Sequence, residues 1–388
     1  MGQEFLKTPW PILGFAQFLG MFPCKRICNE DGSIGLKPMN WKVQWAFFAG
    51  MWLLIGGSGA FLFFLVFSKS PKSSEEIKQC FQEFNGNGSI VDILTTNISG
   101  SIVLLGSFVI HFGNCKMKED LCDFADLLKK TSMKISGSKS FLIVSGLYAP
   151  AYICFSLFHA WITSQCLSLN LIDVTPSSIF FLIGSFIGIF PLVIFFILTL
   201  EIFSCLVYEI DQLRPPKLNP LYLTALLKLT KILDKVRTFL SPNLFWAMTI
   251  VSIQILLMLF FVPSHFINYA RNDDPSAFLL AGSMFLLASC YCTLMWFFNT
   301  HAHKVTNQVH QLKEDLKDIY VPDQSFMVAY EGQTVPAYFL KDRILDKLTN
   351  FAGFDGQGFF VLGKSFLNNF LGFCATYFVI LLQFKLSE

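Results

Sequence analysis

Seven apolar stretches, each long enough to cross a lipid bilayer, recur along this chain of 388 residues. A helix needs about 20 apolar residues to span the hydrocarbon core, and each stretch meets that length. They lie at Val43–Phe67, Ile90–Phe112, Phe141–Gln165, Ser177–Ile202, Phe245–Ile267, Ser276–Phe298 and Phe359–Phe384. Backbone groups in lipid must pair within the chain, so the sequence predicts an all-α, polytopic membrane protein with seven transmembrane helices.

The composition excludes several other classes of protein. Hydrophobic residues make up 53% of the chain and charged residues 14%, which is unlike a soluble domain. The formal net charge is only +2, so no general attraction to nucleic acid is expected. The chain has no glycine-rich phosphate loop, nucleophile elbow or zinc-protease pair, and we expect no enzyme. The cysteines and the group His301, His303 and His310 lack the spacing of a metal site, so no metal or cofactor is predicted.

The positions of the basic residues predict the orientation in the membrane. Alternate segments between the apolar stretches, beginning with the N-terminal arm, carry most of the 29 Lys and Arg residues. By the positive-inside rule the N-terminus is cytoplasmic and the C-terminus extracellular. The sequon Asn87-Gly88-Ser89 then lies outside, which makes Asn87 a candidate glycosylation site. This orientation argues against a G-protein-coupled receptor, whose N-terminus is outside, and less strongly against a transporter.

Amphipathic patterns extend the helices into the cytoplasm. Three stretches combine apolar residues at helical spacing with charged residues, namely Leu221–Leu240, Phe298–Lys317 and Tyr338–Phe351. Together they predict a cytoplasmic helical anchor layer. Pro242 predicts a kink in the fifth helix or a helix start after Ser241. Further along, the breakers between Gly353 and Gly358 predict that the seventh element is split into a cytoplasmic half and a membrane half.

One face of the last membrane helix is polar or small. Steps of about 100° per residue place Ser365, Asn369, Gly372, Phe373, Thr376, Ile380 and Gln383 on a single arc. A polar stripe is costly in lipid, and one helix cannot enclose water, so several copies would have to surround an axis. The stripe therefore favours a symmetric oligomer with a central pore, lined by Asn369, Thr376 and Gln383. Apolar gates are expected at Phe373, Val379 or Ile380. The alternative is that the amides bond to a neighbouring helix within the bundle.

The end of the chain resembles the carboxy-terminal signature of arthropod gustatory receptors. Thr376-Tyr377, five apolar residues and Gln383-Phe384 satisfy every position of that short signature, in the last predicted span. The inverted seven-span topology and the long sixth loop are similar to that family as well.

The resemblance implies a homotetrameric, tastant-gated, non-selective cation channel in the plasma membrane, related in architecture to insect olfactory receptors. The last helix would line the pore, with Gln383 and its neighbour Phe384 at the gate. Native assemblies that mix receptor subunits stay open. On this basis residues 1–42 are a cytoplasmic arm, 43–298 carry helices one to six with the ligand site, 299–358 form the cytoplasmic layer and 359–388 the pore helix.

A tastant site is expected among the outer halves of the earlier helices. A sugar needs several hydrogen-bonding groups beside an aromatic ring. The polar and aromatic candidates are Asp92, Thr96, His159, Trp161, Gln165, Gln254 and His265. These side chains could equally pair with one another between helices or face interfacial water.

The signature does not select the tastant. The main sugar receptors usually carry an acidic residue after the tyrosine, where this chain has Phe378. The apolar filling is similar to that of fructose-type receptors and also of many bitter-type receptors. A channel gated by sugars and one gated by hydrophobic, bitter-type compounds both fit, and a seven-helix transporter or a metabotropic receptor are the alternatives outside the channel class.

Overall fold

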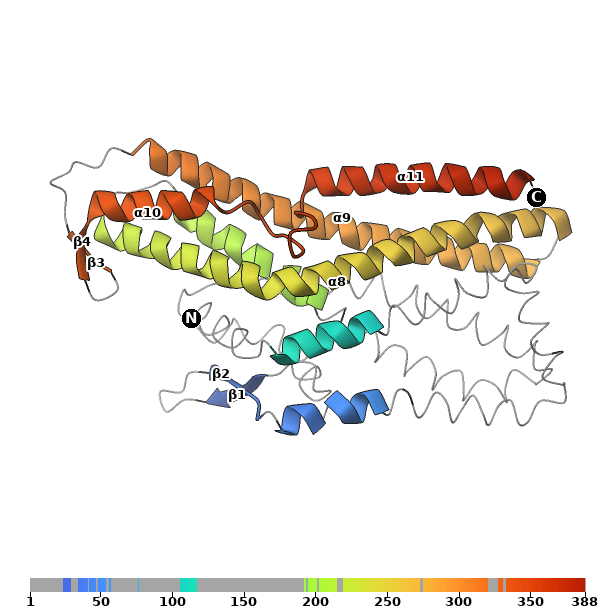
Figure 1. Cartoon of the computed structure of the whole chain (residues 1–388), viewed down its shortest axis with the longest axis horizontal. Coiled ribbons are helices and arrows are strands. Elements are labelled where there is room, and N and C mark those ends of the chain that lie inside the picture. Colours follow the sequence, from blue (N-terminus) through green and yellow to red (C-terminus); the bar gives the residue numbers. More distant parts are fainter. Residues whose placement is uncertain are drawn as a thin grey trace.

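Long helices that run along one axis dominate the structure, a computed structural model (Figure 1). It describes residues 24–28, 34–40, 42–46, 48–53, 56, 76, 105–116, 192, 195–200, 202–214, 219–272, 275–319, 327–330 and 333–387. The fifth, sixth and seventh predicted spans fall almost entirely in the described part. Portions of the first, second and fourth spans are described, and those portions are helical; the third span lies outside the described residues.

Two long antiparallel helices make up much of the described part of the chain. Helix α8 runs over Pro220–Asn272 and helix α9 over Pro275–Lys317, with 53 and 43 residues. At 1.5 Å per residue they are about 80 and 65 Å long, roughly twice the thickness of a bilayer core. Each contains an apolar segment long enough to cross a membrane, so each also extends well beyond it. This agrees with the predicted extension of the fifth and sixth spans.

Helix α8 continues through both of its prolines. Pro242 and Pro263 lie inside the helix, and no break separates residues before Pro242 from those after it. A helix start after Ser241 was one of the two predicted outcomes, and it is wrong. The buried side chains Val236 and Leu240 before Pro242 and Leu244 after it explain the result, because packing on both sides of the proline holds the turn in place.

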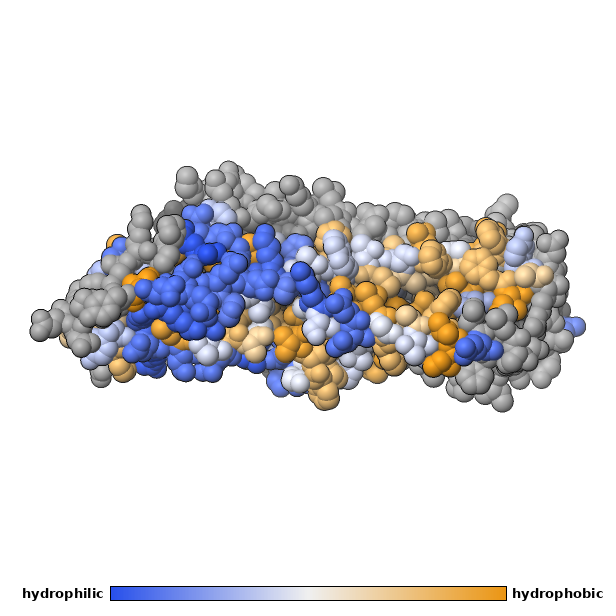
Figure 2. All heavy atoms as spheres, turned by 90° about the horizontal axis from the view of Figure 1, so that it is seen from above, coloured by the Kyte–Doolittle hydropathy of each residue, from blue (hydrophilic) through white to orange (hydrophobic). Residues whose placement is uncertain are grey.

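Polar and apolar residues separate along the long axis. Figure 2 shows hydrophilic residues over the end that holds helix α10, Ala337–Thr349, and hydrophobic residues over the end that holds helix α11, Lys364–Ser387. At the polar end, Arg214 Nε lies 2.7 Å from the Asp315 carboxylate and Lys347 Nζ lies 3.0 Å from that of Asp234. The structure thus has one polar end and one apolar end.

Helix α10 packs through one apolar face. Leu340, Ile344 and Leu348 recur every four residues and are buried against α8 and α9. This spacing places them on one side of an α-helix. The opposite face carries charged residues, so α10 is the amphipathic helix expected near Tyr338–Phe351, and it ends two residues earlier.

The described part of the chain is mostly helical, in keeping with the all-α prediction, but it also contains two short strand pairs that were not predicted. Strands β1, Cys24–Cys28, and β2, Ile34–Pro38, form one antiparallel pair, and β3, Met327–Tyr330, and β4, Gln333–Pro336, form another. Only two residues, one of them a glycine, separate β3 from β4 in the sequence, a length typical of a tight hairpin. Strands this short give no clear period, so hydrophobic patterning missed them.

Two glycines let the helical segment 105–116 approach α8 closely. A Cβ on Gly106 would lie 1.9 Å from Ile250 Cδ1, and one on Gly113 would lie 2.5 Å from Asn243 Oδ1. Gly106 and Gly113 are seven residues apart on their helix, and Asn243 and Ile250 are seven apart on α8, so the two close approaches belong to one continuous contact between the helices. Next to it, buried Asn243 donates from Nδ2 to the side-chain oxygen of Asn114 at 3.0 Å.

Candidate functional site

Helix α11 packs on α8 and α9 through one side only. Leu367 and Cys374 on that side are 9% and 5% exposed. Phe366 and Phe370 also pack partly against the core. Helix α11 begins at Lys364, so residues 359–363, predicted as the start of the last span, belong instead to the loop before it.

The predicted pore residues lie on the other side of α11. All of those with described side chains are exposed, namely Asn369, Phe373, Thr376, Val379, Ile380 and Gln383. Phe373 is 57% exposed and Ile380 43%. The Thr376 hydroxyl donates to the Gly372 carbonyl at 3.0 Å, so its oxygen can still accept a hydrogen bond from outside the helix. Phe384 lies within α11, but its side chain falls outside the described residues.

The tyrosine of the terminal signature supports a predicted gate residue. The Tyr377 ring stacks on the Phe373 ring with centroids 6.3 Å apart and an interplanar angle of 12°. Residues four apart on a helix are neighbours on its surface. Tyr377 therefore restricts the directions in which Phe373 can turn.

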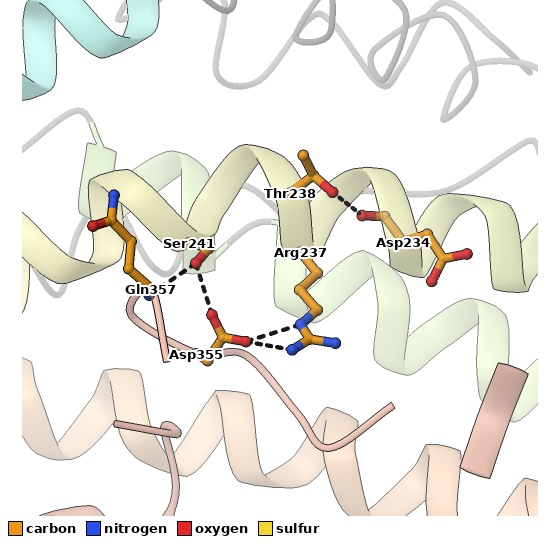
Figure 3. Close-up of polar contacts among 6 residues, drawn as sticks. All are labelled: Asp234, Arg237, Thr238, Ser241, Asp355 and Gln357. Atoms are coloured by element: carbon orange, nitrogen blue, oxygen red, sulfur yellow. Dashed lines mark hydrogen bonds and ion pairs between the residues drawn. The ribbon is translucent and has the colours of Figure 1, made fainter. Parts of the chain in front are cut away.

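A short loop, residues 351–363, joins α10 to α11 and is tied to α8 by one carboxylate. Figure 3 shows Asp355 between Arg237 and Ser241 of α8. The carboxylate accepts hydrogen bonds from Ser241 Oγ at 2.7 Å and from Arg237 Nε and Nη2 at 3.0 and 2.5 Å. Ser241 Oγ in turn accepts the Gln357 backbone N–H at 2.9 Å. We call this loop the anchor loop, because these contacts fix it to α8.

The backbone of the anchor loop needs its glycines. Gly353 has φ 112° and Gly358 has φ 79°, values that side chains with a Cβ rarely adopt. Phe354 between them is fully buried, with its ring centroid 4.6 Å from that of Phe203. The loop is therefore held both by the buried ring of Phe354 and by the polar contacts of the neighbouring Asp355.

The Asp355 carboxylate is stabilised in its charged form. Burial by itself raises its pKa, but hydrogen bonds from Ser241 and Arg237 and the charge of Arg237 outweigh burial, so the pKa is lower than the ordinary value of an aspartate. Its side chain is 12% exposed and that of Arg237 is 39% exposed. The ion pair is therefore partly shielded from solvent and persists at neutral pH.

A second contact fixes the start of α11 to α9. Asn299, which is 1% exposed, accepts the Gly363 backbone N–H on its side-chain oxygen at 3.0 Å. Its Nδ2 group donates to the Met295 carbonyl at 2.9 Å, which sets the orientation of the amide. Asp355 thus fixes the anchor loop to α8, and Asn299 fixes the residue just before α11 to α9.

Two of the predicted tastant residues lie in the described part of the chain. Gln254 and His265 are both on α8 and both 2% exposed. The His265 ring stacks on that of Phe261 with centroids 6.2 Å apart. The other candidates, Asp92, Thr96, His159, Trp161 and Gln165, lie outside the described residues, as does Asn87, so the set as a whole stays a prediction.

Sequence reasoning missed the residues that hold the anchor loop. Arg237 was grouped with the basic residues of an amphipathic helix, and Asp355 was treated as one of several helix breakers. The available signal was a single acidic residue in a glycine-rich turn, which often marks a fixed loop. Its partners are 118 and 114 residues away, so no local pattern identifies them. Among the described residues, no group of three metal-ligating side chains occurs.

The comparisons with known proteins show a shared fold. No protein-family model matches the sequence, and no curated protein sequence matches it. The structure of the insect olfactory receptor OR5 from Machilis hrabei matches with a TM-score of 0.63 and 14% identity, over 97% of this chain and 98% of that one. The same receptor in complex with eugenol matches with a TM-score of 0.59 and 14% identity, over 98% of both chains. The chain thus has the fold of an insect olfactory receptor.

Proposed function

We propose that this chain is a subunit of a tastant-gated cation channel in which α11 lines the pore. One observation carries the proposal: the polar stripe of α11 faces away from α8 and α9 and is exposed in the single chain. In a membrane such a face must meet water or polar partners. Four copies arranged around an axis would satisfy it with a water-filled path.

The proposed orientation places the polar end of the molecule in the cytoplasm. Helix α10 and the ends of α8 and α9 then form the anchor layer that holds the subunits together, and the C-terminus is extracellular. The segregation in Figure 2 and the receptor fold support this arrangement. An epitope tag after Glu388 should be accessible on intact cells, whereas a metabotropic receptor of the opposite orientation would hide it. Glycosidase treatment should shift the mobility of the chain unless Asn87 is changed.

The ligand is proposed to be a small tastant, either a sugar or a hydrophobic, bitter-type compound. The matched olfactory receptor has been solved with eugenol, a small aromatic molecule, which favours a compact site for small molecules within this fold. Gln254 supplies a buried amide for a sugar hydroxyl, and the ring pair His265 and Phe261 supplies an aromatic wall. Both compound classes therefore belong in the test.

The experiment records current from cells that express this chain alone while fructose and then quinine are applied. We expect a cation current from one class, and Gln383→Ala should change ion selectivity or gating because the amide faces the proposed pore. Asn368→Ala is the control, since that exposed amide lies 15 residues before Gln383, about 22 Å along the helix and about 60° around it. Stoichiometric uptake without unitary currents would instead support a transporter. Equal effects of both substitutions would refute the assignment of the pore face.

A further inference from the structure

An apolar groove opens between α8, α9 and α11, on the side of α11 opposite to its polar stripe. Its volume is about 790 Å³, and every described residue that lines it is uncharged. Three phenylalanines contribute to its wall, Phe266 from α8, Phe285 from α9 and Phe378 from α11. Sites for small molecules typically have volumes of about 300–1,000 Å³ and mostly apolar walls. The groove thus has the size and lining of a ligand site.

The hydroxyl groups in the groove have no free proton to offer. Ser289 Oγ donates to the Phe285 carbonyl at 2.8 Å, and Thr293 Oγ1 donates to the Ser289 carbonyl at 2.8 Å. Both hydroxyls line the groove, but their donor capacity is used within α9. The wall can therefore accept hydrogen bonds and is poor at donating them.

Pro263 leaves one backbone carbonyl beside this wall without its usual helical donor. In an unbroken helix the carbonyl of residue 259 accepts the N–H of residue 263, but proline has no N–H. Leu259 and Pro263 both line the groove, and α8 stays helical through them. The Leu259 carbonyl thus lacks its regular helical donor in an apolar space, where an unmet acceptor costs about 1–3 kcal/mol. A bound molecule with one donor group would remove that cost.

We propose that this groove binds a small, neutral, mostly apolar molecule that carries a single hydroxyl donor, such as an alkylphenol. Its hydrocarbon part packs between the phenylalanines and its hydroxyl donates to the Leu259 carbonyl. A lipid acyl chain has no donor for that carbonyl, and the backbone donors of a second copy's helix are already bonded within the helix. Neither Gln254 nor His265, the two predicted tastant residues in the described part of the chain, lines the groove.

The position of the groove links its occupancy to α11. Leu371, Ala375 and Phe378 belong to α11 and form one wall. A molecule bound there presses on the side of α11 opposite to the proposed pore face. The binding itself does not depend on channel activity, whereas an effect on gating rests on the proposed function.

The test uses the full-length chain, purified in phospholipid nanodiscs, and an alkylphenol that carries a photoreactive diazirine. Peptides labelled after illumination are identified by mass spectrometry. We expect adducts on residues that line the groove, with thymol protecting them at about tenfold lower concentration than p-cymene, the same skeleton without the hydroxyl. This readout is independent of current, so failure of the channel proposal leaves it interpretable.

Two variants and one control separate the parts of the proposal. Ala375→Trp fills the groove and should abolish the adducts there, whereas Leu286→Trp, at an exposed position of α9 outside the groove, should leave them unchanged. Pro263→Ala restores the missing N–H and should bring the thymol and p-cymene protection concentrations together without weakening p-cymene. Size-exclusion profiles verify that each variant is folded.

Three outcomes would overturn the proposal. Adducts on the groove residues that persist in Ala375→Trp would show that the ligand does not occupy the space that the tryptophan fills. Equal protection by thymol and p-cymene in the unaltered chain would show that the carbonyl plays no part. Adducts that appear only after the phospholipid is depleted would show that a lipid chain occupies the groove.

Discussion

Replacing Asp355 with alanine should release the anchor loop from α8. The substitution removes the acceptor of the Ser241 hydroxyl, at 2.7 Å, and of the Arg237 guanidinium, whose Nε lies at 3.0 Å. Phe354 stays buried beside the cavity that the shorter side chain leaves. The loop should therefore open locally while α8 and α10 keep their packing.

The size of the effect follows from the contacts and their exposure. A hydrogen bond to a charged group contributes about 1.5–3 kcal/mol when shielded. Arg237 is 39% exposed, so solvent screening reduces its share to about 1 kcal/mol. With about 1–2 kcal/mol from Ser241, local opening should become easier by about 2–3 kcal/mol. Since 1.4 kcal/mol corresponds to a factor of ten, this is roughly a 30- to 150-fold change.

Hydrogen–deuterium exchange of the purified protein, followed by mass spectrometry, measures that change. Peptides covering residues 351–363 should exchange faster by this factor, and the Gln357 amide is the reporter because it bonds to Ser241 Oγ. Asp234→Ala is the control, since that carboxylate is 60% exposed in its ion pair with Lys347 and should matter little. Unchanged loop exchange in Asp355→Ala, or an equal effect of Asp234→Ala, would refute the reasoning.

Three further predictions concern pH and glycine. Because the pKa of Asp355 is lowered in the folded chain, the stabilisation by its carboxylate is complete above about pH 5 and is lost as the pH falls from the ordinary aspartate pKa through the lowered one. Hydrogen exchange of the anchor loop should therefore rise in acid, and should rise less in Asp355→Asn. Gly113→Val should lower thermal stability by about 1–3 kcal/mol, because its Cβ would lie 2.5 Å from Asn243 Oδ1, while Gly282→Ala, with open space around it, should not. Gly353→Ala should destabilise the anchor loop by about 1–2 kcal/mol at φ 112°, seen as faster proteolysis there.

Sequence patterning predicted most of the helical architecture in the described part of the chain. Long apolar windows located the membrane portions of α8 and α9, and amphipathic spacing extended both into the polar end. These predictions succeed because the helical period and the length of an apolar run are local properties. The strand pairs β1–β2 and β3–β4 escaped because each strand has only four or five residues.

Helical phase alone grouped Asn369, Thr376 and Gln383 on one face of the last helix, but it could not tell whether that face is covered. The structure leaves it exposed and packs Leu367 and Cys374 on the opposite side. Which face of a helix is buried depends on its neighbours, and those are fixed by tertiary packing.

By itself, the sequence determined the apolar segments of α8 and α9, the expected orientation and the polar stripe of α11, since each depends only on residues close together in the chain. Tertiary structure decided how α11 is held. The contacts of Asp355 with α8 join residues 118 and 114 positions apart, and the groove behind α11 draws its walls from three helices. Contacts between residues so far apart in the sequence form only when the long helices pack together, because they depend on the free energy of packing and not on local helix propensity.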